Sequence, residues 1–313
     1  RGRSAVPPSP HGILALVRRI ALIVNPFASG VDEARMHAVE AELARVGEVT
    51  LMLTQRPRHA TALAESSSRD YDAVVVFSGD GGFNEALNGA DGETPIGFVP
   101  GGGTSVLPRA LGLPAGPVAA ARSLARSIEA GSVRRISLGT VNGRRFSFGA
   151  GVGLDAEAVR RVDARGRADD GRRPGDLAFT GAVVRLLVEH RGRFEDVLEI
   201  EGFGRAAFAF VANADPYTFA GPMPLRIAPE ARFERGLDLV APRRVTPASL
   251  PRLAVNVLTP RRPTGSGFHY GHDLDRIVVR CDRPLPLQAD GEDLGDVREA
   301  VFEAQRSAVA VLV

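Results

Sequence analysis

One aspartate stands among small residues directly after an apolar run. Residues 74–77 are typical of a buried parallel strand, and residues 83–87 have helical spacing. Between them lies a predicted tight turn made of Ser78, Gly79, Asp80, Gly81 and Gly82. Backbone N–H groups at a helix N-terminus suit phosphate, and glycines let a ligand approach closely. A carboxylate there needs a reason, because it repels phosphate. Binding Mg²⁺ or accepting a proton from a nucleophile would supply one.

Two further loops of small residues follow predicted strands. Residues 20–24 lead into a loop that contains Asn25, Pro26, Ser29 and Gly30, and residues 95–99 lead into Gly101, Gly102, Gly103 and Thr104. The carboxyl ends of parallel strands share one edge of a sheet, so we expect all three loops at one phosphate-binding crevice. Each loop alone has a simpler interpretation as an Asx turn or a flexible connection. Their joint occurrence favours a ligand site.

These loops require an alternating scaffold of strands and helices. Strands at 20–24, 49–53, 74–77 and 95–99, with helices at 31–46, 61–66 and 118–128, predict a doubly wound parallel α/β sheet. Beyond residue 133, short strands predict a second, mostly antiparallel and β-sandwich-like domain. These strands are expected at 134–140, 145–148, 197–200, 206–212, 237–241, 275–280, 286–289 and 308–313, and helices at 177–189 and 247–258. Residues 1–18 are expected to form a flexible tail.

Composition narrows the chemistry. The chain has 313 residues, 44% of them hydrophobic, and a net charge of +2, which by itself argues little about nucleic acid or membranes. No nucleic-acid partner is expected. It contains no Lys, which excludes a Lys-based phosphate loop and Schiff-base chemistry. Glycine N–H groups, Arg and a metal must therefore hold any triphosphate. The single Cys281 excludes an internal disulfide and favours a cytoplasmic location.

Two charged segments stand outside the loops. Asp290 and Glu292 lie on a predicted turn after a strand, where a solvated hairpin tip is an equally good interpretation. Several arginines gather at 160, 161, 165, 167, 172 and 173, and acids at 163, 169 and 170 offset them. A solvated loop is the favoured interpretation of that cluster, and contact with an anionic membrane is the alternative.

The motifs together resemble the diacylglycerol kinase catalytic-domain family, which includes bacterial lipid kinases and the sphingosine and ceramide kinases. Residues 78–89 are similar to the family's G-G-D-G-T-x-N-E-V-x-N-G block, and residues 24–30 to its opening N-P-x-[SG]-G loop. Residues 100–112 align with P-x-G-[ST]-x-N-x-[FL]-A-R-x-L-G, residues 149–156 with the block that opens the second domain, and residues 290–292 with D-G-E. The likeness extends from about residue 19 to residue 313.

The resemblance implies a nucleotide-binding α/β domain at 19–132, a β-rich lipid-binding domain at 133–298, and a last strand at 299–313 that returns to the first domain. It implies that Asp80, or the turn with Asp290 and Glu292, supplies the catalytic base, that Asp80 faces Mg²⁺, and that Asp155 meets the lipid head group. The implied ATP-binding residues are Asn25, Pro26, Ser29, Gly30, Ser78, Gly79, Gly81, Gly82, Asn84, Glu85, Gly101, Gly102, Gly103, Thr104 and Arg160.

The expected function is therefore ATP- and Mg²⁺-dependent phosphorylation of a lipid hydroxyl, foremost that of diacylglycerol, by an enzyme in peripheral contact with a membrane. Sphingoid or ceramide-type lipids are alternative substrates. An NAD kinase is another alternative, although Asn84 and Glu85 follow the loop at once, as in lipid kinases. A nucleotide- or lipid-binding regulator is a third. Its motivation is that Gly82, Ser105 and Arg235 replace residues usual in the family.

Overall fold

The structure is a computed structural model that describes residues 18–164, 176–221, 223–263, 265 and 267–313. The predicted tail lies outside the described residues except for Arg18, which already belongs to the first strand. The arginines at 165, 167, 172 and 173 also lie outside them.

The first part of the chain forms a parallel sheet in the order β4-β3-β1-β2. Val24 pairs with Phe77 on one side and with Leu53 on the other, so the strands end at a common edge. Helix α1 packs with α5 and α2 with α3, and residues 20–24 and 73–77 are buried beneath them. The elements are β1 Arg18–Val24, α1 Glu33–Leu43, β2 Gly47–Leu53, α2 His59–Asp70, β3 Ala73–Ser78, α3 Asp80–Gly89, β4 Ile96–Pro100, α4 Val106–Ala110 and α5 Pro117–Ala130.

The rest of the chain is mostly antiparallel, in the order β14-β13-β10-β7-β15-β16, with β5 and β8 paired at the sides. Its strands are β5 Arg134–Val141, β6 Arg144–Phe146, β7 Gly149–Val152, β8 Leu198–Ile200, β9 Gly204–Ala206, β10 Ala209–Ala212, β11 Thr218–Ala220, β12 Met223–Leu225, β13 Leu237–Pro242, β14 Phe268–Leu274, β15 Arg276–Ala289 and β16 Glu292–Val311. Its helices are α6 Leu154–Asp163, α7 Asp176–Glu189, the 3₁₀ turn η1 Pro247–Ser249 and α8 Leu250–Leu258.

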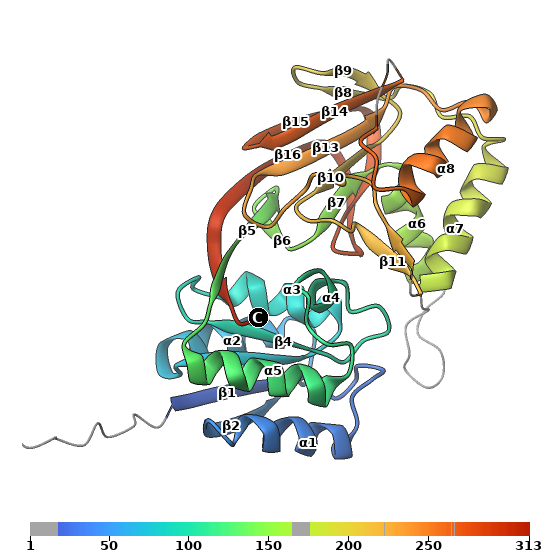
Figure 1. Cartoon of the computed structure of the whole chain (residues 1–313). Coiled ribbons are helices and arrows are strands. Elements are labelled where there is room, and N and C mark those ends of the chain that lie inside the picture. The colour runs from blue at the N-terminus through green and yellow to red at the C-terminus, as the bar shows by residue number, and fades with distance from the viewer. Residues whose placement is uncertain (1–17, 165–175, 222, 264, 266) are drawn as a thin grey trace, which may run out of the picture.

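Strand β16 joins the two parts of the sheet. It pairs with β15 and β5 along its length, and at its end Val311 pairs in parallel with Ile96 of β4. Figure 1 shows this long strand running down from the upper sheet to the C-terminus beside β4. The expected fold class, a parallel α/β sheet combined with a larger β-rich part, is confirmed, whereas the division near residue 132 stays a prediction.

Several features of the β-rich part differ from the predictions. Strands β7, β11, β12 and β14 were not predicted, and the strand predicted at 206–212 is divided between β9 and β10. The strands predicted at 275–280 and 286–289 are parts of one 14-residue strand that begins at Arg276, and the last strand begins at Glu292 and not at Ala308. The prolines in β15 are accommodated where its register with β16 shifts, which is how strands tolerate proline. Helix α6 was missed. It buries Leu154, Ala158 and Val162, which share a helix face, but its buried Asp155 weakens the apolar pattern.

Candidate active site

The three loops of small residues lie together at the carboxyl edge of the parallel strands. The Asn25 N–H donates to Phe77 O at 3.0 Å, the Gly30 N–H to Gly101 O at 2.8 Å, and the Gly101 N–H to Ser78 O at 2.7 Å. The first loop is therefore bonded to the third, and the third to the second. This backbone network fixes the loops relative to one another before any ligand arrives.

Two glycines allow the second and third loops to approach closely. A Cβ on Gly102 would lie 2.7 Å from the Gly79 Cα, and a Cβ on Gly79 would lie 3.3 Å from the Gly102 Cα. Both distances are shorter than an ordinary carbon contact, so side chains here would force the loops apart. Glycine is required for the close approach of these two backbones.

Helix α3 begins inside the predicted turn. Gly79 is its N-cap and Asp80 its first residue, so residues 80–82 belong to the helix and the predicted turn over 78–82 is wrong in that respect. The N–H groups of the first turn and the positive end of the helix dipole therefore face the loops, which suits an anion. The Asp80 Oδ1 accepts from the Leu107 N–H at 3.2 Å and ties α3 to the start of α4.

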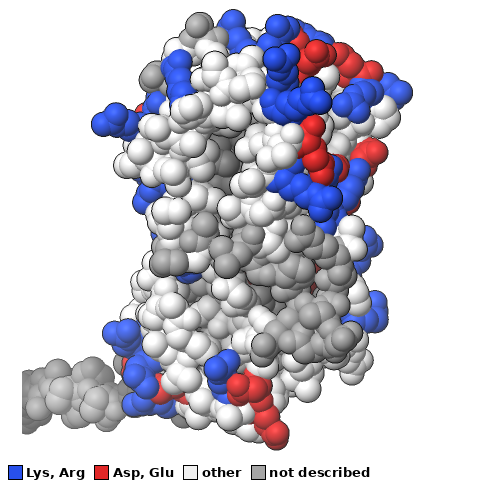
Figure 2. Space-filling view, turned by 90° about the vertical axis from the view of Figure 1, so that its right-hand side faces the viewer, with Lys and Arg blue, Asp and Glu red and all other residues white. Residues whose placement is uncertain are grey.

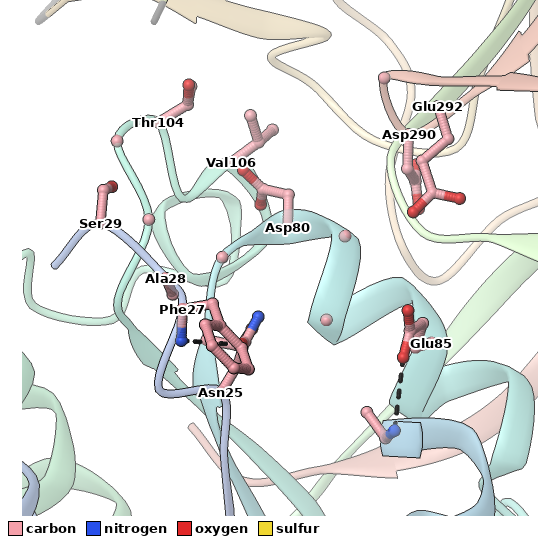
Figure 3. A pocket seen from close by; sticks show the side chains of 18 of the residues that line it. Asn25, Phe27, Ala28, Ser29, Asp80, Glu85, Thr104, Val106, Asp290 and Glu292 are labelled. Atoms are coloured by element: carbon pink, nitrogen blue, oxygen red, sulfur yellow. Dashed lines mark hydrogen bonds between the residues drawn. The ribbon is translucent and has the colours of Figure 1, made fainter. Parts of the chain in front are cut away.

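The loops open into a cavity of about 1000 Å³. Asp80 lies between the first and third loops on one side and the turn with Asp290 and Glu292 on the other (Figure 3). Thirteen of the residues proposed from the sequence line the cavity, namely Asn25, Ser29, Ser78, Gly79, Asp80, Gly81, Gly82, Glu85, Gly102, Gly103, Thr104, Asp290 and Glu292. The structure thus brings segments from both parts of the chain to one cavity.

Asp290 is buried and holds the cavity wall together. It occupies the turn between β15 and β16 with φ 48°, followed by Gly291 with φ 77°. Its carboxylate accepts five hydrogen bonds, from Asn84 Nδ2, the Ser147 N–H and Oγ, and the Phe148 and Gly149 N–H groups, at 2.6–3.2 Å. Burial raises the pKa of Asp290, while these donors oppose the rise. The turn is a hairpin tip, as one interpretation held, but its Asp290 is buried and not solvated.

Glu292 reaches the second loop from the opposite side of the cavity. A Cβ on Gly81 would lie 3.2 Å from Glu292 Oε1, so this oxygen sits against the start of α3. The other oxygen, Oε2, forms an ion pair with Arg144, which also donates to Asn84 Oδ1 at 3.0 Å. Glu292 therefore lies where a phosphate held by the second loop would come near it.

Several residues predicted at the site serve as supports. Asn84 is fully buried and donates to Arg145 O and to Asp290. Glu85 lines the cavity and also accepts from the Ala60 N–H at the start of α2. Gly30 and Gly101 bond the loops to each other, and Pro26 lies in the turn where the Ala28 N–H donates to Asn25 O. These residues hold the loops around the cavity in position.

Arg160 lies in a different environment from the phosphate contact that the resemblance implies. Its guanidinium pairs with Asp293 at 2.9 Å and with Asp296 at 2.7 Å, and these carboxylates raise its pKa. Arg160 thus anchors α6 to the start of β16. Among the residues described, the arginine that lines the cavity is Arg56, which was not proposed from the sequence.

Asp155 forms a buried polar group with two residues that line the cavity. Its Oδ2 accepts from Tyr217 Oη at 2.7 Å and from Gln288 Nε2 at 2.8 Å, and Gln288 also donates to Tyr217. Burial raises the pKa of Asp155 and, with the neighbouring carboxylate, that of Tyr217. Asp155 is connected to the cavity through Tyr217 and Gln288, which line it. They were missed because no local spacing connects residues 155, 217 and 288.

The raised pKa of Asp155 predicts a pH dependence of stability. The pKa in the folded state exceeds that of the unfolded state, about 3.9, so Asp155 contributes stability fully below pH 4 and loses it as the pH rises through the folded value. The free energy of unfolding of the wild type, minus that of Asp155→Asn, should therefore fall from pH 4 upward. Denaturant titrations at several pH values measure this difference. A difference that stays flat or rises with pH contradicts the assignment.

The cavity residues fit a nucleotide that brings its own magnesium. The glycines let the backbones of the loops pack closely against one another beside the cavity, and the N-terminus of α3 favours negative charge. No group of three or more His, Cys, Asp or Glu residues able to hold a metal occurs among the described residues. Mg²⁺ commonly uses one or two carboxylates together with substrate phosphates, and Asp80 and Glu292 offer such a pair.

Comparisons with known proteins agree with this geometry. The model of the diacylglycerol kinase catalytic domain matches residues 19–141. A diacylglycerol kinase of Bacillus subtilis is 32% identical over 286 residues, which cover 88% of this chain and 90% of that protein. Human sphingosine kinase 1 is 31% identical over 221 residues, 59% of this chain and 53% of that one.

Solved structures show the same fold. A putative diacylglycerol kinase of Bacillus anthracis superimposes with a TM-score of 0.73 at 18% identity, over 95% of this chain and 97% of that one. An NAD kinase of Archaeoglobus fulgidus in complex with ATP superimposes with a TM-score of 0.52 at 14% identity, over 94% and 93% of the two chains. On its sequence match along nearly the whole length, the chain belongs to the diacylglycerol kinase catalytic-domain family of lipid kinases.

Proposed function

We propose that the protein transfers the γ-phosphoryl group of ATP, with Mg²⁺, to a lipid hydroxyl, foremost that of diacylglycerol. The observation that carries the proposal is the junction of three small-residue loops with the 290–292 turn around a single cavity. The backbone at the start of α3 offers donors for phosphate, and the turn brings acids from the β-rich part. The diacylglycerol kinase of Bacillus subtilis, similar along nearly the whole chain, supports the choice of lipid.

Different groups at the site have different roles in an in-line phosphoryl transfer. Bound Mg²⁺ would supply charge neutralisation on the phosphates. The loop N–H groups hold the triphosphate, and Asp80 at the start of α3 orients the acceptor hydroxyl and takes its proton. Asp290, with five hydrogen bonds, holds the turn in place and is not the base in this proposal. Positioning and charge stabilisation account for most of the rate.

The far part of the cavity suits an acyl chain. Its wall includes Phe148, Val159, Val162, Phe179 and Phe219, which come from the β-rich part of the chain. Apolar side chains next to a phosphate cradle fit a substrate with a polar head and a hydrocarbon body. The adjacent polar group of Tyr217 and Gln288, backed by Asp155, would meet the head group.

The test is transfer of labelled phosphate from ATP to a panel of diacylglycerol, sphingosine, ceramide, undecaprenol and NAD. We expect label in diacylglycerol above all the other acceptors. Label in sphingosine or ceramide alone would keep the lipid kinase and change its substrate. Label in NAD alone would overturn the lipid assignment. NAD belongs in the panel because the fold is similar to that of an NAD kinase. Binding of ATP without any transfer would favour a regulator.

A lipid substrate implies contact with a bilayer, and one face of the protein suits it. Val184 and Val188 of α7 and Val255 and Leu258 of α8 are exposed, and the β11–β12 hairpin touches both helices. The stretch 239–272, which contains α8, has five arginines and no Asp or Glu. On this side of the molecule, arginines gather toward the upper edge with several acids among them, above an area of described residues that is largely uncharged (Figure 2). None of the described helices has the length and apolar character needed to cross a membrane. We propose that this face docks on an anionic bilayer.

Charge on the exposed side of α8 should abolish docking. The double variant Val255→Asp with Leu258→Asp should bind phosphatidylglycerol vesicles about tenfold or more weakly, because apolar burial is lost and anionic lipid repels the new charge. Co-sedimentation measures the binding, and Val133→Asp, exposed before β5, is the matched control. Unchanged binding of the double variant, or equal loss in the control, contradicts this docking face.

A further inference from the structure

The side-chain positions of residues 78 and 82 overlap in space. Ser78 ends β3, and Gly82 lies four residues later on the first turn of α3. A Cβ on Gly82 would overlap the Ser78 Oγ and lie 2.8 Å from the Ser78 Cβ. Rotation of the serine cannot relieve the second contact, because the Cβ does not move with χ1. The structure therefore admits a side chain at one of these positions, and here it comes from residue 78.

The family pattern has the same pair in the opposite order. In G-G-D-G-T the first position is glycine and the last is threonine, whereas this chain has Ser78 first and Gly82 last. Taken alone, Gly82 looks like the loss of a hydroxyl from the loop. Because the two side-chain positions overlap, the loop still has a hydroxyl, which Ser78 at the end of β3 provides in place of a threonine at residue 82.

The Ser78 hydroxyl is in an unusual environment. Ser78 is 1% exposed and lines the cavity, and its Oγ has no hydrogen-bond partner among the described residues. A buried hydroxyl without a partner is unfavourable, and most such groups in native proteins have one. It lies beside the N-terminus of α3, where an anion is favoured. These facts together indicate that a ligand is its partner.

We infer that the Ser78 Oγ donates a hydrogen bond to a phosphate oxygen of the bound nucleotide, and that residue 82 is glycine because Ser78 fills its space. The inference rests on the proposed function, since it needs a nucleotide phosphate in this crevice. It makes Ser78 a binding residue of the phosphate loop. It also removes one reason to regard the chain as a weakened relative.

The variant Ser78→Ala separates binding from stability, because the two should change in opposite directions. Without the hydroxyl, Mg-ATP should bind about tenfold more weakly, as expected for a lost hydrogen bond to a charged group. The ligand-free protein should melt at a higher temperature, because a buried unpartnered group has been removed. Calorimetric titration and thermal unfolding give both values. Ser127→Ala is the control, since that buried hydroxyl donates to Ser123 O on α5. It should leave ATP binding unchanged and should not raise the melting temperature.

A position exchange tests the shared space. Gly82→Thr alone should lower both stability and ATP affinity, because it collides with Ser78. Adding Ser78→Gly to it should restore ATP affinity to within a few-fold of the wild type. Equal affinity of wild type and Ser78→Ala for ATP, or failure of the double variant to improve on Gly82→Thr, overturns the inference while the proposed function stands. A wild type that does not bind Mg-ATP overturns both.

Discussion

Asp80→Asn should lower the rate of phosphoryl transfer by roughly 10²–10⁴-fold, the range typical for loss of a general base. An asparagine oxygen can still accept from the Leu107 N–H, so the contact between α3 and α4 and the melting temperature should be preserved. Initial rates at saturating ATP and lipid, together with thermal unfolding, measure the two quantities. The expected loss is in kcat, because the variant keeps the loops that hold the nucleotide.

Glu292→Gln is the matched comparison, since Glu292 reaches the same loop from the opposite wall. It removes the ion pair with Arg144 but leaves Asp80 in place, so its effect on kcat should be smaller. Near-normal turnover in Asp80→Asn with a large loss in Glu292→Gln would move the role of base to the turn. That outcome is the other assignment that the sequence left open.

Asp290→Asn should lower the free energy of unfolding by about 3 kcal/mol, because at least one buried donor loses its acceptor and the new amide adds donors. The carboxylate accepts from α3 through Asn84 and from three consecutive N–H groups at residues 147–149, so the damage should reach both sides of the cavity. Denaturant titration at neutral pH measures the loss.

The control for this variant is Asp296→Asn on the same strand. Asp296 is about half exposed and pairs with Arg160, and pairs of this kind contribute about 0–1 kcal/mol. A loss in Asp290→Asn no larger than in Asp296→Asn would contradict the role of Asp290 as the clamp of the wall. A large loss in kcat without loss of stability would instead point to direct chemistry.

The sequence predicted the loops because the rule that places them is local. Each follows an apolar strand, and parallel strands end at one edge, so residues 25–30, 78–82 and 101–104 could be expected to meet. The start of α3 was placed too late because the loop's glycines have low helix propensity, and tertiary contacts such as that of Asp80 with Leu107 override it.

The supports of the site could not be predicted because their partners are distant in sequence. Asn84 meets Asp290 across 206 positions, and Asp155 meets Gln288 across 133. Arg160 looked available for phosphate until its pairing with Asp293 was visible. Residues 78 and 82 differ from these supports, because they are close in sequence and both lie in a predicted motif. The structure was still needed to relate them, since only the distance between their side-chain positions shows that one side chain excludes the other.

The proposed function requires one site in which three loops and the 290–292 turn together hold a triphosphate. Hydrogen exchange of the backbone amides, with and without a slowly hydrolysed Mg-ATP analogue, tests this most directly. We predict slower exchange at residues 25–30, 78–82 and 101–105 together, and at the 290–292 turn. Protection that appears elsewhere in the chain and leaves these four segments unchanged would contradict the account.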